Sequence, residues 1–139
     1  MGLSFLVFPS TEHTRFQHAL GAMHLATKAV HALRHQQVRI SDDEAEALYA
    51  CMLLHDLGHG PFSHALEHVF FPKNSHEDMS IALMKKLNTA FDGKLTLAIE
   101  MFTNNYSRGF LHQLISSHID LDRLDYLKRD SFYSGVTEG

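Results

Sequence analysis

The chain has 139 residues, of which 45% are hydrophobic and 20% are charged, and its formal net charge is -4. This composition is typical of an ordinary soluble globular protein, and the length favours a single domain that buries roughly two thirds of its unfolded surface. The negative charge excludes a general attraction to nucleic acid backbones, whose partners usually present a strongly basic surface. The 12 histidines are many for this length, so the question is which of them carry chemistry.

The first residues, Gly2 to Phe8, are apolar. They lack the basic region and the cleavage site of a signal peptide and are too short to span a bilayer, so we expect them to belong to the core. The one cysteine, Cys51, lies in an apolar run and has no partner for a disulfide within the chain. This favours a buried thiol, a cytoplasmic location and no membrane partner.

Residues from about Thr14 to Arg34 have the periodicity of a long helix. One apolar stripe at helical spacing comprises Phe16, Leu20, Met23, Thr27 and Val30, and a second comprises Ala22, Leu25 and Ala29. His24, His31 and His35 lie on the polar side of the helical wheel, where we expect them to be solvated. Arg15 and His18 fall among the apolar positions instead, and a buried charge or imidazole needs a partner.

A capping box, Ser41-Asp42-Asp43-Glu44, predicts the start of a second helix, which is apolar through Leu54 and which we expect Gly58 to end. Pro61 suits the first turn of a short helix. Further helices are expected from Ser75 through Leu87, near residues 94–102, near 109–117, and over about Leu121 to Phe132. The sequence has no convincing strand or repeat, and the predicted fold is an all-α bundle of about six to seven helices.

The vicinal pair His55-Asp56 is predicted to lie in the last turn of an apolar helix. The helix dipole disfavours a negative charge there by a few tenths to about 1 kcal/mol, so a cation beside Asp56 would stabilise it. The alternative is an ion pair with an arginine such as Arg15. His18 could supply a third ligand, and nitrogen and oxygen ligands without thiolate favour a catalytic ion such as Mn, Mg, Fe, Ni or Zn.

The last predicted helix places three polar residues on one face at spacing i, i+4, i+8: Asp122, Tyr126 and Asp130. Asp122 opens this helix and is interpreted either as a ligand or as the N-cap. Arg123 lies close by. Asp125 and Arg129 are four residues apart and are expected to form an ordinary ion pair.

The remaining polar candidates surround the segment after Gly58. His64 and Glu67 are three apart on a predicted helix, so the carboxylate could orient the imidazole for proton transfer, unless both belong to a solvated polar stripe. His59 lies between two glycines and could contact a phosphate, and His76 begins a helix, where an anion is stabilised. No functional role is expected for His13, His68, His112 and His118.

Four segments together resemble the HD-domain metal-dependent phosphohydrolases, a superfamily named for its vicinal His-Asp: residues 14–21, 55–64, 75–77 and 119–130. The resemblance is closest to the deoxynucleoside triphosphate (dNTP) triphosphohydrolase-like branch, which includes enzymes with a SAM and an HD domain. It implies one HD domain over residues 1–139. Family members usually have more chain on both sides, so we expect a truncated or minimal version, the catalytic core of a longer architecture.

The resemblance also implies roles for individual residues. The ligands of one divalent metal ion would be His18, His55, Asp56 and Asp122. Proton transfer beside the scissile phosphate would use His64, supported by Glu67. The phosphates would be surrounded by His59, His76, Arg15 and Arg123. Tyr126 and Asp130 would face the sugar.

The implied reaction is attack of water on the α-phosphorus of a dNTP, which yields a deoxynucleoside and triphosphate. A second hypothesis keeps the metal and assigns another phosphoester, such as a nucleoside monophosphate or a signalling nucleotide. A third is a metal-bound regulatory or oligomerisation module without catalysis. The expected partners are a nucleotide and further copies of the chain, with neither a membrane nor a nucleic acid.

Overall fold

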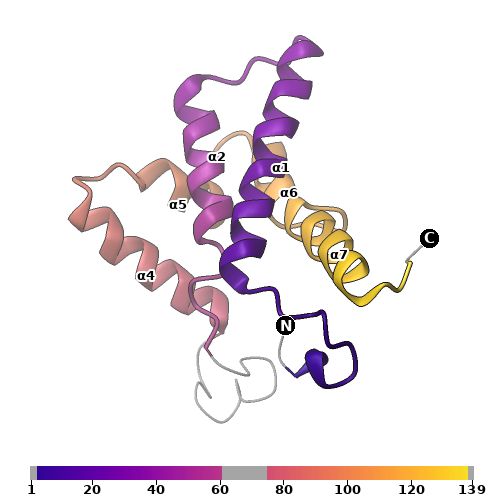
Figure 1. Ribbon diagram of the computed structural model, residues 1–139. Coiled ribbons are helices and arrows are strands. Elements are labelled where there is room, and N and C mark those ends of the chain that lie inside the picture. The colour runs from indigo at the N-terminus through magenta and orange to yellow at the C-terminus, as the bar shows by residue number, and fades with distance from the viewer. Residues whose placement is uncertain (1–2, 61–74, 138–139) are drawn as a thin grey trace.

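In the computed structural model, the described residues are 3–60 and 75–137, and their regular structure consists of helices alone (Figure 1). These are a short 3-10 helix, η1 (Ser4–Leu6), and six α-helices: α1 (Arg15–His35), α2 (Asp42–Leu54), α4 (His76–Ala90), α5 (Thr96–Phe102), α6 (Gly109–Ile115) and α7 (Leu121–Ser134). The all-α prediction is confirmed. No helix in the described ranges is long and apolar enough to cross a membrane.

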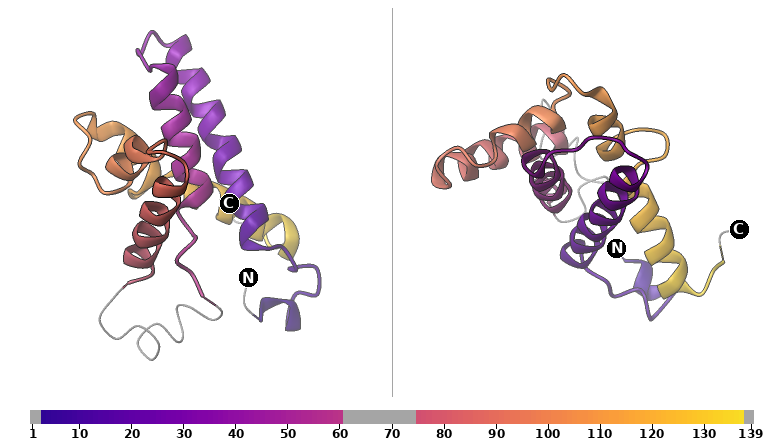
Figure 2. Two further views of the ribbon diagram at one scale, coloured as in Figure 1. Left: turned by 90° about the vertical axis from the view of Figure 1, so that its left-hand side faces the viewer. Right: turned by 90° about the horizontal axis from the view of Figure 1, so that it is seen from above.

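The helices α1 and α2 form an antiparallel pair at the centre of the molecule (Figures 1 and 2). The helix α1 contacts α2 and α7, whereas α2 also contacts α5 and α6, and α4 reaches the core through α5. Because α1 and α2 run in opposite directions, the end of α2 lies beside the first turns of α1. The polar residues of both segments therefore meet at one end of the bundle.

Small side chains form the buried face of α1. This face comprises His18, Ala19, Ala22, Ala26 and Val30. The predicted stripe is wrong at Phe16 and Leu20, which are 67% and 39% exposed. Helical periodicity defines two apolar arcs on α1, and the arc with the smaller side chains is buried because alanines let α1 lie close to its neighbours.

The apolar N-terminal segment does not join the core as predicted. Leu6 and Val7 are 68% and 74% exposed. The segment that follows lies against the end of α7, where the Ser10 hydroxyl donates to the Tyr133 carbonyl and the His13 ring stacks on the Tyr133 ring. The space between the central helices is already filled by their own buried side chains, so no room remains for these residues.

A side-chain cap begins each of four helices. The side chains of Thr14, Ser41, Ser75 and Asp120 each accept a hydrogen bond from the backbone N–H three residues later. The predicted capping box at Ser41 is confirmed, and two further, unpredicted ones lie at Thr14 and Ser75. Each cap satisfies an N–H group that the first turn leaves without a helical partner, which fixes where the helix starts.

A buried carboxylate ties the start of α2 to the loop between α5 and α6. Glu44 is 5% exposed and accepts hydrogen bonds from the Arg108 guanidinium at 2.6 and 2.7 Å and from the Tyr106 hydroxyl at 2.8 Å. Burial alone would raise the pKa of the Glu44 carboxyl, but hydrogen bonds from the Ser41 backbone, Arg108 and Tyr106 outweigh it and lower that pKa to about 2. The ionised carboxylate thus stabilises the fold.

This cluster predicts a pH-dependent loss of stability in Glu44→Gln. The folded-state pKa lies below the ordinary value of 4.5, so the stabilisation is fully present above pH 4.5 and is lost as the pH falls toward 2. A depression of this size corresponds to about 3 kcal/mol. We expect urea denaturation at pH 7 to give Glu44→Gln a free energy of unfolding lower by about that amount. The difference in free energy of unfolding between wild type and Glu44→Gln should be smaller at pH 3.5. Identical denaturation curves at pH 7 would contradict a stabilising role of the ionised Glu44.

Candidate metal centre

The turn after α2 presents the His-Asp pair. The helix α2 ends at Leu54, with His55 as its C-cap, and not at Gly58 as predicted. The Ser80 hydroxyl donates to the His55 carbonyl at 2.7 Å and accepts from the Gly58 N–H at 2.8 Å. Since Ser80 takes the carbonyl that a continuing helix would use, the chain leaves the helix here. Asp56 therefore lies just beyond the last turn and not within it.

The same turn packs closely against the start of α4. A Cβ atom at Gly58 would lie 2.0 Å from the His76 carbonyl oxygen and 2.5 Å from the Ser80 nitrogen, so only glycine fits at this position. The close approach brings His59 over His76, with the two rings stacked at 4.0 Å. Glycine at position 58 thus allows the turn after α2 to lie in direct contact with α4.

Two imidazole rings face each other at the centre of the site. His18 is 2% exposed, and its Nδ1 donates to the Asp125 carboxylate at 2.8 Å. The Nδ1 of His55 donates to the Met52 carbonyl at 2.7 Å. With both Nδ1 atoms protonated, each neutral ring carries a lone pair on Nε2, and these two Nε2 atoms lie 3.3 Å apart. Facing lone pairs repel unless a cation lies between them.

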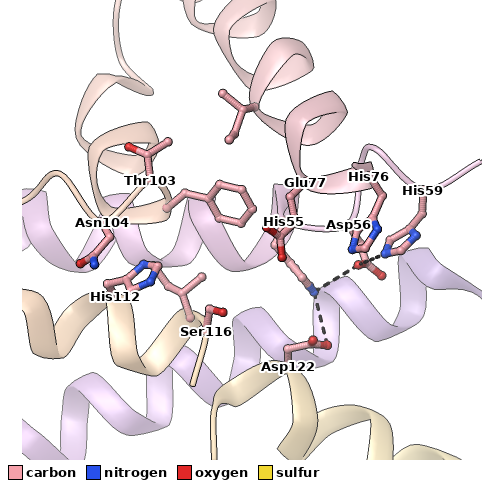
Figure 3. Close-up of a pocket in the computed structure, with 13 residues that line it drawn as sticks. His55, Asp56, His59, His76, Glu77, Thr103, Asn104, His112, Ser116 and Asp122 are labelled. Atoms are coloured by element: carbon pink, nitrogen blue, oxygen red, sulfur yellow. Dashed lines mark ion pairs between the residues drawn. The ribbon is translucent and has the colours of Figure 1, made fainter. Parts of the chain in front are cut away.

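Two carboxylates complete this arrangement. An oxygen of Asp122 lies 2.9 Å from Nε2 of His18 and 3.5 Å from Nε2 of His55. Oxygens of Asp56 lie 3.6 Å from Nε2 of His55 and 3.9 Å from Nε2 of His18. In Figure 3, Asp56 and Asp122 lie on either side of the His55 ring nitrogen. The helix α1, the turn after α2 and the helix α7 therefore deliver four side chains to one point.

The spacing of these atoms fits a divalent cation. Ligands about 2.1 Å from an ion are about 3 Å apart when adjacent and about 4.2 Å apart when opposite. The distances from Nε2 of His18 and Nε2 of His55 to each other and to the two carboxylates, 2.9 to 3.9 Å, are close to this span. The ligand atoms of His18, His55 and Asp56 all lie within 4.8 Å of one another. Two imidazoles and two carboxylates suit a transition metal or Mg²⁺ in a catalytic site. The donor set could hold one such ion.

The electrostatics of the centre favour positive charge. Burial opposes ionisation of Asp122, but hydrogen bonds with His18 and His55 outweigh it and hold the pKa of its carboxyl far below the usual range. Burial likewise lowers the pKa of His18, but hydrogen bonds with Asp122 and Asp125 outweigh it and raise that pKa above 6.5. The surrounding carboxylates thus stabilise positive charge at His18, and they would stabilise a bound cation in the same way.

The ion pair suggested as an alternative for Asp56 is also present. Nη1 of Arg15 lies 2.7 Å from one Asp56 oxygen, while the other oxygen faces His55 and lies 3.4 Å from Nε2 of His59. The ion pair with Arg15 and a role as metal ligand are therefore compatible in one carboxylate. The pairing partly neutralises Asp56 and orients it toward the histidines.

A cavity of about 510 Å³ opens beside the centre (Figure 3). Among the residues predicted from the sequence, those that line it are His55, Asp56, His59, His76 and Asp122. The opposite end carries polar side chains without a carboxylate, namely Thr103, Asn104, His112 and Ser116. The cavity therefore has an end with carboxylates at the candidate metal centre and a polar end without them between α5 and α6.

The predicted substrate-binding residues are not brought into this cavity. The residues concerned are Arg15, Arg123, Tyr126 and Asp130. The Asp130 carboxylate lies 2.7 Å from Nε2 of His13, and Arg123 is half exposed beside Asp120. His64 and Glu67 lie outside the described residues. The N-cap of α7 is Asp120, so the alternative role for Asp122 is excluded.

Sequence reasoning missed the contact between Asp125 and His18. Asp125 pairs with Arg129 as predicted, but the same carboxylate accepts a hydrogen bond from the buried imidazole. Its position three residues after Asp122 places it on the same side of α7, which is the signal that could have identified it. His13 and His112, expected to be without a role, are respectively a buried ring stacked on Tyr133 and a residue of the cavity wall.

Comparisons with known proteins agree with this geometry. A family model for the HD domain matches residues 15–130. The chain is similar to a phosphohydrolase from Bacteroides thetaiotaomicron whose crystal structure is known. The two sequences are 52% identical, the TM-score is 0.93, and the match covers 96% of this chain and 33% of that chain. The uncharacterized protein YwfO of Bacillus subtilis is 36% identical over 100% of this chain and 33% of that protein.

A further relative carries a functional name. The protein named deoxynucleoside triphosphate triphosphohydrolase SAMHD1 homolog, from Dictyostelium discoideum, is 33% identical over 97% of this chain and 30% of that protein. The chain therefore spans about a third of the length of the relatives that it matches.

The geometry predicts that Asp56→Asn abolishes metal binding. An amide is a poor ligand for a divalent ion and removes one of the two negative charges at the centre. We expect equilibrium dialysis against Mn²⁺ to give about one ion per wild-type chain and none per Asp56→Asn chain. Asp42→Asn is the matched control, because Asp42 is an exposed carboxylate paired with Arg34 far from the centre. Equal Mn²⁺ content in wild type and Asp56→Asn would remove Asp56 from the ligands.

Proposed function

The chain belongs to the HD domain family, and we propose that it is a metal-dependent phosphohydrolase that acts on nucleotides. The observation that carries this proposal is the convergence of His18, His55, Asp56 and Asp122 beside an open cavity. Domains of this family bind divalent metals, and the ligand atoms of His18, His55 and Asp56 lie within 4.8 Å of one another, which supports a metal here. The similarity to a phosphohydrolase of known structure supports the same reaction class.

We assign the metal to these four residues. A bound divalent ion would polarise a phosphoryl oxygen and lower the pKa of a water molecule that it holds. The chain's own contribution is to orient the ligands: His18 and His55 present Nε2 because their Nδ1 atoms donate to Asp125 and to the Met52 carbonyl.

His59 and His76 are proposed to bind phosphate oxygens. Both line the cavity beside Asp56, and the stacked rings can donate N–H groups toward an anion there. His76 also opens the 15-residue helix α4, whose N-terminus stabilises negative charge. Proton transfer is assigned to His64 with Glu67 by family resemblance alone.

Within this class we propose a dNTP as substrate, with a deoxynucleoside and triphosphate as products. The support is the relative named as a dNTP triphosphohydrolase. In this assignment Arg15 and Arg123 bind phosphates, and Tyr126 and Asp130 face the sugar. Arg15 would then have to exchange Asp56 for a phosphate, and Asp130 would have to exchange His13 for a hydroxyl.

A second candidate is hydrolysis of another phosphoester, such as a nucleoside monophosphate. It is favoured by the cavity wall, because the described residues that line it include neither Arg123 nor Tyr126. It keeps the metal centre and the roles of His59 and His76 unchanged.

Two further expectations remain proposals: that the chain forms one domain, and that it self-associates. Exposed aromatic side chains on two helices, Phe16 on α1 and Phe132 on α7, support the second, being 67% and 79% exposed.

Product analysis separates the candidates. We expect the Mn²⁺-loaded chain to release triphosphate and a deoxynucleoside from dNTPs, detected by ion-exchange chromatography, with Asp56→Asn inactive and Asp42→Asn active. Orthophosphate from monophosphates would support the second candidate instead. No turnover of any nucleotide by a chain that binds Mn²⁺ stoichiometrically would contradict both and favour a regulatory or oligomerisation module.

Isotope labelling tests the position of attack. If water attacks the α-phosphorus, reaction in ¹⁸O-labelled water places one labelled oxygen in the triphosphate, because the bond that breaks joins that phosphorus to the 5′ oxygen. A label in the 5′-hydroxyl of the deoxynucleoside would contradict the proposed chemistry.

A further inference from the structure

Behind His18, on the side away from the other ligands, lies a buried ion pair within α7. Asp125 is 7% exposed. One of its oxygens accepts from Nδ1 of His18 at 2.8 Å and from Nε of Arg129 at 2.8 Å, and the other accepts from Nη2 of Arg129 at 2.9 Å. Three hydrogen bonds thus fix the carboxylate in one orientation.

A glycine on α1 provides the space for this pair. A Cβ atom at Gly21 would lie 1.9 Å from an oxygen of Asp125 and 2.2 Å from Nη2 of Arg129. Gly21 is three residues after His18, so the ligand and the gap lie on neighbouring turns of the same helix face. The Asp125–Arg129 pair therefore sits between α1 and α7 where a larger side chain would exclude it.

This arrangement constrains the ligand. An ionised carboxylate only accepts hydrogen bonds, so it holds the proton of His18 on Nδ1 and leaves Nε2 with a lone pair. Nε2 then points toward Asp122, 2.9 Å away, and toward Nε2 of His55, 3.3 Å away. Arg129 donates to both oxygens of Asp125, which prevents the carboxylate from rotating.

We propose that Asp125, held by Arg129 across Gly21, is a positioning residue that selects the metal-binding tautomer of His18 and fixes the direction of its Nε2. The inference rests on the proposed metal centre. The Asp125–Arg129 ion pair would therefore increase the metal affinity in addition to stabilising α7.

Glu44 offers a matched comparison within the chain. It is also a buried carboxylate, 5% exposed, and it is paired with an arginine, Arg108. Its partners are the α2 cap, Tyr106 and Arg108, none of which is a candidate ligand. Substituting Glu44 therefore removes the same charge and a similar ion pair without touching His18.

The substitution Asp125→Asn discriminates between positioning and simple stabilisation. An amide has one oxygen, whereas the native group accepts through two. If that oxygen replaces the one near His18, the NH₂ group opposes the Arg129 guanidinium. If the amide is reversed, its NH₂ group opposes Nδ1–H of His18 and drives the ring toward the tautomer with a proton on Nε2, which cannot bind a metal through Nε2.

We expect the Mn²⁺ dissociation constant of Asp125→Asn, measured by isothermal titration calorimetry, to rise roughly 10- to 100-fold. Glu44→Gln should lose thermal stability with no change in Mn²⁺ affinity. The visible absorption spectrum of the Co²⁺-loaded protein should change in Asp125→Asn and stay unchanged in Glu44→Gln. Arg129→Gln, which leaves the carboxylate in place, should weaken Mn²⁺ binding less than Asp125→Asn.

Each other outcome is decisive. Helical Asp125→Asn protein with wild-type Mn²⁺ affinity and Co²⁺ spectrum would overturn the positioning role and leave the metal centre intact. If Asp125→Asn does not fold, unchanged Mn²⁺ affinity in folded Arg129→Gln would overturn it equally. A wild-type chain that binds no Mn²⁺ would overturn the proposed function together with this inference.

Discussion

The constraint on which the rest of the structure depends is the approach of two imidazole Nε2 atoms to 3.3 Å between two carboxylates. Both rings are oriented by hydrogen bonds at Nδ1, so their lone pairs face each other in a partly buried space. Such an arrangement is unfavourable without a positive charge. Despite burial, the neighbouring carboxylates raise the pKa of His18 and the two histidines lower the pKa of the Asp122 carboxyl. A divalent ion between these groups would be stabilised by the same charges.

Close helix contacts make this convergence possible. The alanine face of α1 allows α2 and α7 to approach, Gly21 leaves space for the Asp125–Arg129 pair, and Gly58 lets the turn after α2 lie against α4. Ser80 then holds that turn by both its hydroxyl proton and its oxygen. Small residues on neighbouring helices and in the turn after α2 thus position the candidate ligands, although these small residues are not candidate ligands themselves.

Local patterns in the sequence predicted the described α-helices and indicated His18, His55 and Asp56 as candidate ligands, whereas Asp122 was assigned as a ligand through the family resemblance. Caps such as Ser41 act within four residues, and His18 was conspicuous because a polar residue stood among apolar positions. Local patterns could not show which of the two apolar arcs on α1 is buried, because this depends on how closely α2 packs against α1. The early end of α2 depends likewise on Ser80, 25 residues after His55. The role of Asp125 depends on a contact with His18 that spans 107 residues.

The direct test of the account is the position of the metal itself. A crystal of the Mn²⁺-loaded chain, measured at a wavelength near the manganese absorption edge, would locate the ion by anomalous scattering. The account predicts one anomalous peak about 2.1–2.2 Å from Nε2 of His18, Nε2 of His55 and oxygens of Asp56 and Asp122. A peak elsewhere, or none at this position in a crystal shown to contain manganese, would contradict it.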